Sequence, residues 1–245
     1  MIEPTPEVPG FPRERLNRYL DRNRTLPVRD TLLRALALGD PPGAAVDLGC
    51  GPGKEVAELL RRGWTVEAVD AYPDMVDAAR AAAEATVGAD HCSRSLRCVH
   101  QRLADWDAPA GSFDLVHAGF SLPFIARTDF TALWARVVRS LRPGGLFAGQ
   151  FFGPNDSFVA QSPAGSMSVH ARADVDAMLV GLTVLSIAEE ERDGVIGVPP
   201  NEVPKHWHVF HVIARRVGCA RTATHAYLSL RLDAGFGLLN RALCG

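Results

Sequence analysis

The segment that most constrains this chain is the run AVDLGCGPGKEVAELL, from Ala45 to Leu60. It begins with the pattern of a buried strand and ends with that of a helix, and three glycines spaced G-x-G-x-G separate the two. Glycine has no Cβ, so it permits tight turns and the close approach of a ligand, and a helix start offers unpaired N–H groups. The run therefore predicts a strand, a ligand-binding loop and a helix.

Composition narrows the class of protein and its partners. Hydrophobic residues make up 47% of the 245 residues, which is typical of a folded globular protein, and the net charge is −2. No segment carries a basic stripe or a long apolar run, which favours a small-molecule substrate over nucleic acid or a membrane. The first residues lack the apolar core of a signal peptide, so we expect a cytoplasmic protein, and a homodimer stays open. Five unevenly spaced cysteines indicate no disulfide framework, and we expect no metal.

Strand and helix patterns alternate after the first forty residues. The predicted strands are Ala44–Leu48, Thr65–Val69, Leu96–His100, Phe113–Ala118 and Leu146–Phe152, and the predicted helices between them are Gly53–Arg62, Pro73–Glu84 and Asp129–Leu141. Such alternation is typical of an α/β fold, a doubly wound and mostly parallel sheet with helices on both faces. Two later strands, Thr183–Glu190 and His206–Arg215, predict an antiparallel edge, and Gly153–Ser168 is expected to be a loop.

The chain divides into three predicted parts. Residues 1–40 are a lead-in and an N-terminal helical cap, with helices over Arg13–Leu20 and Thr31–Leu38. Residues 41–217 form the ligand-binding domain, and residues 218–245 are a C-terminal extension whose role the sequence does not indicate.

Several motifs follow one another in a fixed order. The glycine run is followed by Asp70 at the end of the second strand, by Phe113-Asp114-Leu115-Val116 in the fourth, and by Leu141-Arg142-Pro143-Gly144-Gly145 before the fifth. Together these motifs resemble the class I S-adenosylmethionine-dependent methyltransferases, which have a Rossmann-like fold. The resemblance covers about Ala44 to Arg215 and implies S-adenosylmethionine as the cofactor.

The resemblance also implies which residues bind the cofactor. The glycine loop lies under its amino-acid part, Asp70 accepts both ribose hydroxyls, and Asp105 accepts from the adenine amino group, with Asp107 as the rival acid. Trp106 is the aromatic neighbour that could stack on adenine. The full predicted set is Arg24 (with Arg22 as its alternative), Asp47, Gly49, Cys50, Gly51, Gly53, Asp70, Ala71, Met75, Ala104, Asp105, Trp106, Ala118, Gly119 and Phe120.

The acceptor side is predicted from two further segments. Phe120-Ser121-Leu122-Pro123-Phe124 and Lys205-His206-Trp207-His208 resemble a tellurite-resistance-type branch of small-molecule methyltransferases. His206 and His208 share one strand face and are candidate proton acceptors, or the polar face of an edge strand. The predicted substrate residues are Phe124, Gln150, Phe152 and Trp207, whereas His117 and Asp114 are interpreted as structural.

Methyl transfer to an oxygen, nitrogen or sulfur atom of a small molecule is the function that this pattern indicates. One alternative is an NAD-linked oxidoreductase, which shares the strand–glycine–helix start and the acid of the second strand. The spacing favours the methyltransferase, because Lys54 stands where a dinucleotide fingerprint has its third glycine. A second alternative is a non-catalytic protein that binds S-adenosylmethionine.

Overall fold

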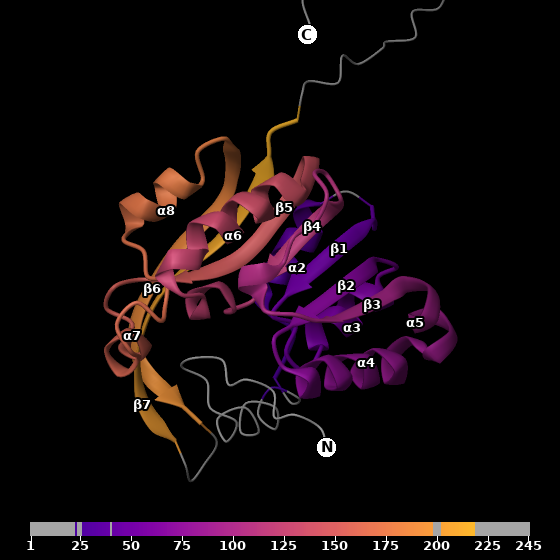
Figure 1. Cartoon of the computed structure of the whole chain (residues 1–245), viewed down its shortest axis with the longest axis horizontal. Coiled ribbons are helices and arrows are strands. Elements are labelled where there is room, and N and C mark those ends of the chain that lie inside the picture. Colours follow the sequence, from indigo (N-terminus) through magenta and orange to yellow (C-terminus); the bar gives the residue numbers. More distant parts are fainter. Residues whose placement is uncertain (1–22, 24–25, 40, 198–201, 219–245) are drawn as a thin grey trace, which may run out of the picture.

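A single seven-stranded sheet organises the protein, and its strand order is β3-β2-β1-β4-β5-β7-β6 (Figure 1). The computed structural model describes residues 23, 26–39, 41–197 and 202–218. The first five strands are parallel, and β7 pairs antiparallel with both β5 and β6. The strands are β1 (Ala44–Leu48), β2 (Thr65–Asp70), β3 (Leu96–His100), β4 (Phe113–Ala118), β5 (Leu141–Phe152), β6 (Leu182–Ile196) and β7 (Val203–Arg216). The predicted Rossmann-like sheet with an antiparallel edge is confirmed.

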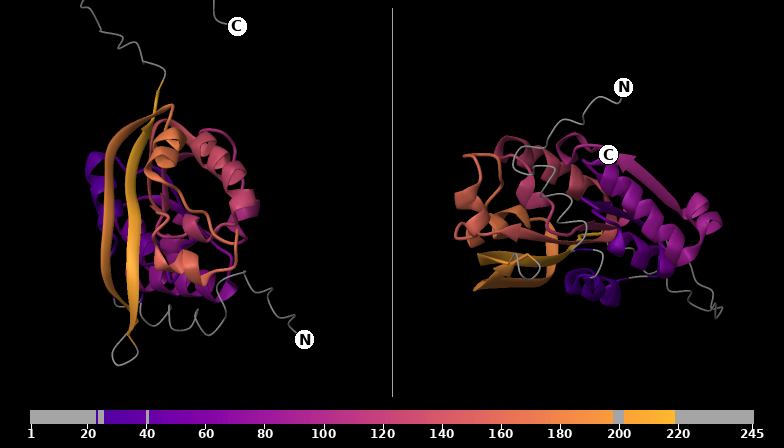
Figure 2. Two further views of the ribbon diagram at one scale, coloured as in Figure 1. Left: turned by 90° about the vertical axis from the view of Figure 1, so that its left-hand side faces the viewer. Right: turned by 90° about the horizontal axis from the view of Figure 1, so that it is seen from below.

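Helices cover both faces of the sheet, because each strand buries alternate residues on opposite sides. Ala45, Leu115 and Ala148 belong to one hydrophobic cluster with α2, α3 and α4, whereas Val46, Val116 and Phe147 belong to another with α6 and α8. Figure 2 (left) shows α6 and α8 together on one side of the long strands β6 and β7. The helices are α2 (Asp30–Leu38), α3 (Lys54–Arg61), α4 (Pro73–Val87), α5 (Ala89–Ser95), α6 (Arg127–Ser140), α7 (Ser157–Gln161) and α8 (Arg172–Met178).

The structure corrects several element boundaries. β5 begins at Leu141, so the predicted Arg142-Pro143-Gly144-Gly145 turn lies inside the strand, at a register shift opposite Phe113 and Leu115. The expected loop 153–168 contains the short helix α7, which begins where the side chain of Asp156 accepts from the N–H of Phe158. α5 was not predicted, β6 continues to Ile196 instead of ending at Glu190, and β7 begins at Val203 instead of His206.

Some predictions fall outside the described residues. These are the helix 13–20, the whole 218–245 extension apart from its first residue, and the cofactor role of Arg24 or Arg22. Helix α2, which lies within the predicted cap region, packs against β5 and β7. Among the described helices, none has the length and apolar character that a membrane span requires.

Candidate functional site

The glycine loop after β1 is shaped by positive backbone angles. Gly49, Gly51 and Gly53 have φ values of 77°, 51° and 83°, a region that glycine adopts without strain. A Cβ on Gly49 would lie 2.3 Å from Cβ of Ser121, and one on Gly53 would lie 2.4 Å from Cα of Ala79. Gly53 therefore brings the start of α3 close to α4, and Gly49 brings the end of β1 close to the loop after β4.

Asp70 ends β2 and faces the glycine loop. Its Oδ2 accepts from the N–H of Gly51 at 2.9 Å, and its Oδ1 accepts from the N–H of Tyr72 at 3.1 Å. Burial raises the pKa of Asp70 to about 6, because these donors offset only part of the loss of hydration. A carboxylate has about four lone-pair sites, so each oxygen can still accept from a neighbouring hydroxyl. The predicted Ala71 follows directly, and Met75 is buried in the first turn of α4.

Asp47 and His117 form a buried pair beneath the loop. They are register partners on β1 and β4, and Nδ1 of His117 lies 2.7 Å from Oδ1 of Asp47. Asp47 Oδ2 and His117 Nε2 have no hydrogen-bond partner among the described residues. Gly119 lies above the pair, where a Cβ would come within 2.8 Å of His117 Cε1 and of Arg29 Nε. The structure thus offers a buried acceptor oxygen under the glycine loop and confirms His117 as a core residue.

The predicted adenine-binding residues differ in how exposed their side chains are. Ala104 and Asp105 lie in a single helical turn, Leu103–Asp105, and the side chain of Asp105 is exposed. Trp106 is 1% exposed, and its indole N–H donates to Glu67 at 3.1 Å. A ring this buried offers no face to a ligand, so the structure assigns Trp106 to the core instead of to adenine stacking. Asp105 stays a prediction.

The exit of β4 carries a strained aromatic residue. Phe120 has φ 60° and is the only non-glycine residue with a positive φ in the described part of the chain. Such a conformation costs a bulky side chain about 1–3 kcal/mol. The N–H of Phe120 donates to Oε1 of Gln150 at 3.1 Å, and Arg29 lies over the Phe120 ring at 4.6 Å. Strain of this kind persists where the surroundings fix it, and it concentrates at functional sites.

Five aromatic rings converge beside this exit, and we call them the aromatic cluster: Phe120, Phe124, Phe152, Phe158 and Trp207. Neighbouring rings lie 6.0–6.3 Å apart between centroids. The predicted substrate residues Phe124, Phe152 and Trp207 are therefore brought together by the fold. Gln150 lies in the next position on the same face of β5 as Phe152.

A buried ion pair packs against the aromatic cluster. Lys205 Nζ contacts Oδ1 of Asp156, and both side chains are almost fully buried. The ammonium also lies 4.3 Å from the ring centroid of Phe158 and 4.5 Å from that of Trp207. Burial lowers the pKa of Lys205, although Asp156 opposes this effect. The pair fixes the start of α7 against β7.

His206 and His208 lie on β7 and pair with acids of β6. His206 Nδ1 lies 2.7 Å from Oδ1 of Asp193, and His208 Nε2 lies 3.0 Å from Oε1 of Glu189. By strand alternation both point to the opposite face of β7 from Trp207. Their role as proton acceptors stays a prediction. Sequence reasoning missed four residues near Gln150, namely Arg29, Thr31, Glu190 and His211. Strand alternation could have indicated His211, because it lies four positions after Trp207 on one strand and so shares its face.

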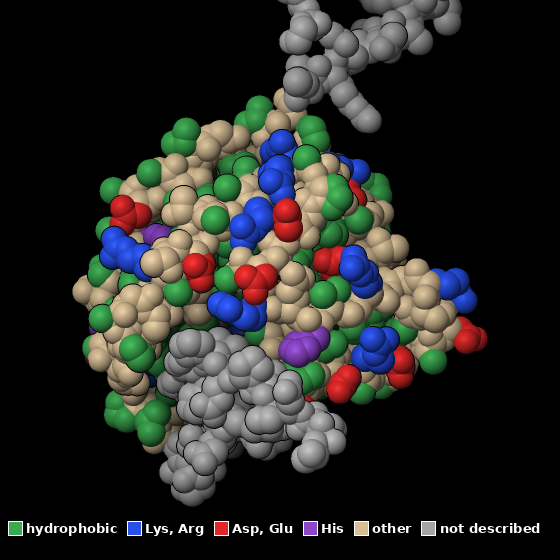
Figure 3. All heavy atoms as spheres, viewed as in Figure 1, with side chains coloured by type: hydrophobic (Ala, Val, Ile, Leu, Met, Phe, Trp, Pro, Cys, Tyr) green, Lys and Arg blue, Asp and Glu red, His purple; other side chains and the backbone are tan. Residues whose placement is uncertain are grey.

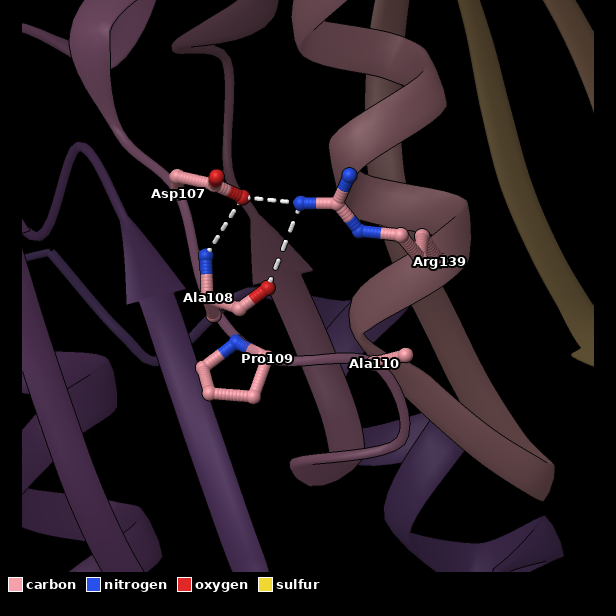
Figure 4. Close-up of a pocket in the computed structure, with 5 residues that line it drawn as sticks. All are labelled: Asp107, Ala108, Pro109, Ala110 and Arg139. Carbon is pink, nitrogen blue, oxygen red and sulfur yellow. Dashed lines mark hydrogen bonds and ion pairs between the residues drawn. The ribbon is translucent and has the colours of Figure 1, made fainter.

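Neither the charged surface nor a separate hollow gives a reason to place the functional site elsewhere. In the view of Figure 3, acidic and basic side chains are interspersed over the described part of the surface. A shallow hollow elsewhere is lined by Asp107, Ala108, Pro109, Ala110 and Arg139, and in Figure 4 Asp107 and Arg139 point toward one another across it as an ion pair. None of these residues belongs to the glycine loop or to the aromatic cluster.

Comparison with known proteins agrees with this geometry. Residues 45–145 match the family model described as a methyltransferase domain. This part of the chain is therefore similar to methyltransferase domains. The matched region contains the glycine loop, Asp70 and the exit of β4, and the match supports S-adenosylmethionine as the cofactor.

Individual relatives match about half of the chain in sequence, and solved structures match about three quarters or more of it in fold. A trans-aconitate 2-methyltransferase from Azoarcus sp. (strain BH72) is 33% identical over 125 residues, which are 51% of this chain and 44% of the relative. The chain thus matches less than half of the length of this curated relative. TehB from Haemophilus influenzae has a similar fold, with a TM-score of 0.62 and 14% identity over 81% of this chain and 65% of TehB. An S-adenosylmethionine-dependent methyltransferase from Mesorhizobium loti has a TM-score of 0.56 and 18% identity over 75% of this chain and 96% of its own.

Proposed function

We propose that this protein binds S-adenosylmethionine at the glycine loop and transfers a methyl group to an oxygen, nitrogen or sulfur atom of a small molecule. The observation that carries the proposal is Asp70, a buried carboxylate that two backbone N–H groups fix at the end of β2. Its remaining lone pairs suit the two hydroxyls of a ribose. Oδ2 of Asp47, which has no hydrogen-bond partner among the described residues, offers a second buried acceptor, which suits an ammonium group. The residues present therefore fit the polar parts of this cofactor.

The bound cofactor would supply an electrophilic methyl group on a sulfonium. The chain's own residues have three tasks. Asp70 and the glycine loop hold the ligand, Phe120 and Gly119 border the edge of β4, and the aromatic cluster excludes water from the acceptor side. The acceptor itself is not carried over from the relatives, because their matches cover less than half of the relatives' own length. We include a small-molecule partner and a cytoplasmic location in this proposal.

Calorimetric titration with S-adenosylmethionine, S-adenosylhomocysteine and NAD tests the cofactor. We expect micromolar binding of the first two and none of NAD, and Asp70→Ala should weaken binding by at least tenfold. Asp105→Ala and Asp107→Ala form a matched pair, since both acids are exposed and lie two positions apart. Only Asp105→Ala should weaken binding if Asp105 holds the adenine amino group.

Two outcomes would contradict the proposal. Binding of NAD without S-adenosylmethionine would favour the oxidoreductase alternative, and binding without turnover of any thiol, hydroxyl or amine would favour a non-catalytic protein. Replacing His206 and His208 together tests their predicted role, and full turnover in that double variant would exclude it.

A further inference from the structure

A histidine that the sequence analysis did not single out faces the strained exit of β4. His211 of β7 is the register partner of Gln150 on β5, and its ring lies 6.1 Å from the ring of Phe120. Its side chain is about one-quarter exposed, at 24%. His211 is thus a titratable group on the face of the sheet that carries Gln150 and Phe120.

The hydrogen bonds around Gln150 determine how the His211 ring is protonated. The N–H of Phe120 must donate, so the atom of Gln150 that receives it is the oxygen Oε1. Nε2 of Gln150 then donates to Thr31 Oγ1 at 2.7 Å and faces His211 Nδ1 at 3.5 Å. A donor beside Nδ1 requires a lone pair there, which leaves the ring proton on Nε2.

An acid holds the other side of the same ring. His211 Nε2 lies 3.1 Å from Oε2 of Glu190, a residue on β6 whose Oε1 also accepts from Arg192. The Nε2–H therefore donates to a carboxylate, an arrangement that stabilises the imidazolium formed when Nδ1 takes up a proton. The contact of Nδ1 with Gln150 lies at the limit of hydrogen-bond length, so a closer hydroxyl can replace it. Two further charged groups lie near this face: Arg29 lies over Phe120, and Lys205 lies over Trp207.

We propose that His211 is the proton-accepting residue of this protein and that its acceptor substrate is a phenol held by the aromatic cluster. This inference rests on the proposed methyltransferase function. The phenolic O–H bond breaks and its proton goes to Nδ1 of His211, while the oxygen forms a bond to the methyl carbon as the carbon–sulfur bond breaks and sulfur keeps the electron pair. The proton leaves to water after the product departs. A phenol needs such a base at neutral pH because its pKa is near 10, whereas an ionised carboxylate does not.

The substrate class follows from the side chains that surround His211. Phe120 contacts the rings of His211, Phe152 and Trp207 edge-to-face at 6.1 Å each. Phe120, Phe124 and Trp207 are only partly buried, so they present ring surface that a planar molecule can cover. An aromatic ring bearing a hydroxyl suits this combination of apolar faces and one base.

The variants His211→Asn and Glu190→Gln test the assignment, with His91→Asn on α5 as the matched histidine control. Nitrogen-15 NMR of the wild-type imidazoles should show the Nε2–H form at His211, and Glu190→Gln should mix the two neutral forms. S-adenosylhomocysteine affinity should stay within about twofold in all three variants. A wild-type protein that does not bind S-adenosylhomocysteine would contradict the proposed function and not this inference alone.

Turnover is measured with two probe pairs, phenol with thiophenol and 2-naphthol with 2-naphthalenethiol. We expect His211→Asn to lower kcat for the phenols on the order of a hundredfold with little change in KM. The same variant should lower kcat for the thiols only a few fold, because thiols ionise readily. An Nδ1–H ring in the wild type, equal losses for phenols and thiols, or no methylation of either phenol by a protein that binds S-adenosylhomocysteine would overturn the inference.

Discussion

Lowering the pH should weaken cofactor binding through Asp70 in a calculable way. Ribose hydroxyls donate to the ionised carboxylate, so binding requires the form that burial disfavours. With a pKa of about 6, nearly all of Asp70 is ionised at pH 7.5 but only about one molecule in eleven at pH 5. The affinity for S-adenosylhomocysteine should therefore fall by about tenfold between these pH values, or roughly 1.4 kcal/mol.

The same shift has the opposite effect on folding. The folded-state pKa of Asp70 lies above the value of about 3.9 in an unfolded chain, so the folded protein binds the extra proton between about pH 4 and 6. The contribution of Asp70 to the free energy of unfolding therefore falls as the pH rises through this window, by about 3 kcal/mol in total. Acidification thus increases the contribution of Asp70 to the free energy of unfolding while it weakens cofactor binding.

Calorimetry at closely spaced pH values between 5 and 7.5 measures the effect. Asp70→Asn provides the control, because it removes the titrating group and keeps an acceptor oxygen. Its weaker affinity should lose this tenfold pH dependence. A wild-type affinity that stays flat over this range, or the same slope in Asp70→Asn, would refute the reasoning.

Two further perturbations test the packing of the site by urea unfolding. Gly53→Ala should cost roughly 3 kcal/mol or more, because it adds a contact 2.4 Å from Ala79 Cα to the cost of a positive φ, whereas Gly165→Ala (φ 75°, no atom within 4 Å) should cost only about 1–2 kcal/mol. Equal losses would show that the close approach is not real. Asp156→Asn should cost about 3–5 kcal/mol because it leaves Lys205 buried without its counter-charge, and adding Lys205→Met should recover most of that loss. A double variant that is no more stable than Asp156→Asn would contradict the ion-pair account.

Local patterns predicted the cofactor half of the fold well. The Ala45–Leu60 run and Asp70 depend on strand, turn and helix signals that lie within a few residues of one another. The first four strands match their predicted ranges to within one residue, and the glycine spacing correctly indicated backbone that bends at each glycine. Contacts between neighbours in sequence are the ones that a sequence displays directly.

Features that depend on distant partners were not predictable. Trp106 looked available for adenine because nothing local indicates its bond to Glu67, which lies 39 positions away. The role that we propose for His211 depends on the strand register, which sets it beside Gln150 and Glu190. The bulge that places residues 142–145 inside β5 likewise depends on pairing with β4, whereas the local Pro-Gly-Gly sequence indicated a turn.

Because β7 lies between β5 and β6 in the sheet, the cofactor side and the acceptor side of the site come from different parts of the chain. The described residues that we assign to the cofactor come from one continuous stretch, 47–120, whereas the acceptor side is assembled from the loop after β4, the end of β5, α2, the start of α7 and the late β6–β7 hairpin. A change in the hairpin can therefore alter which molecule is recognised and leave the glycine loop and Asp70 untouched. Exchange of this hairpin between related proteins would be the simplest route to a new acceptor on an unchanged cofactor scaffold.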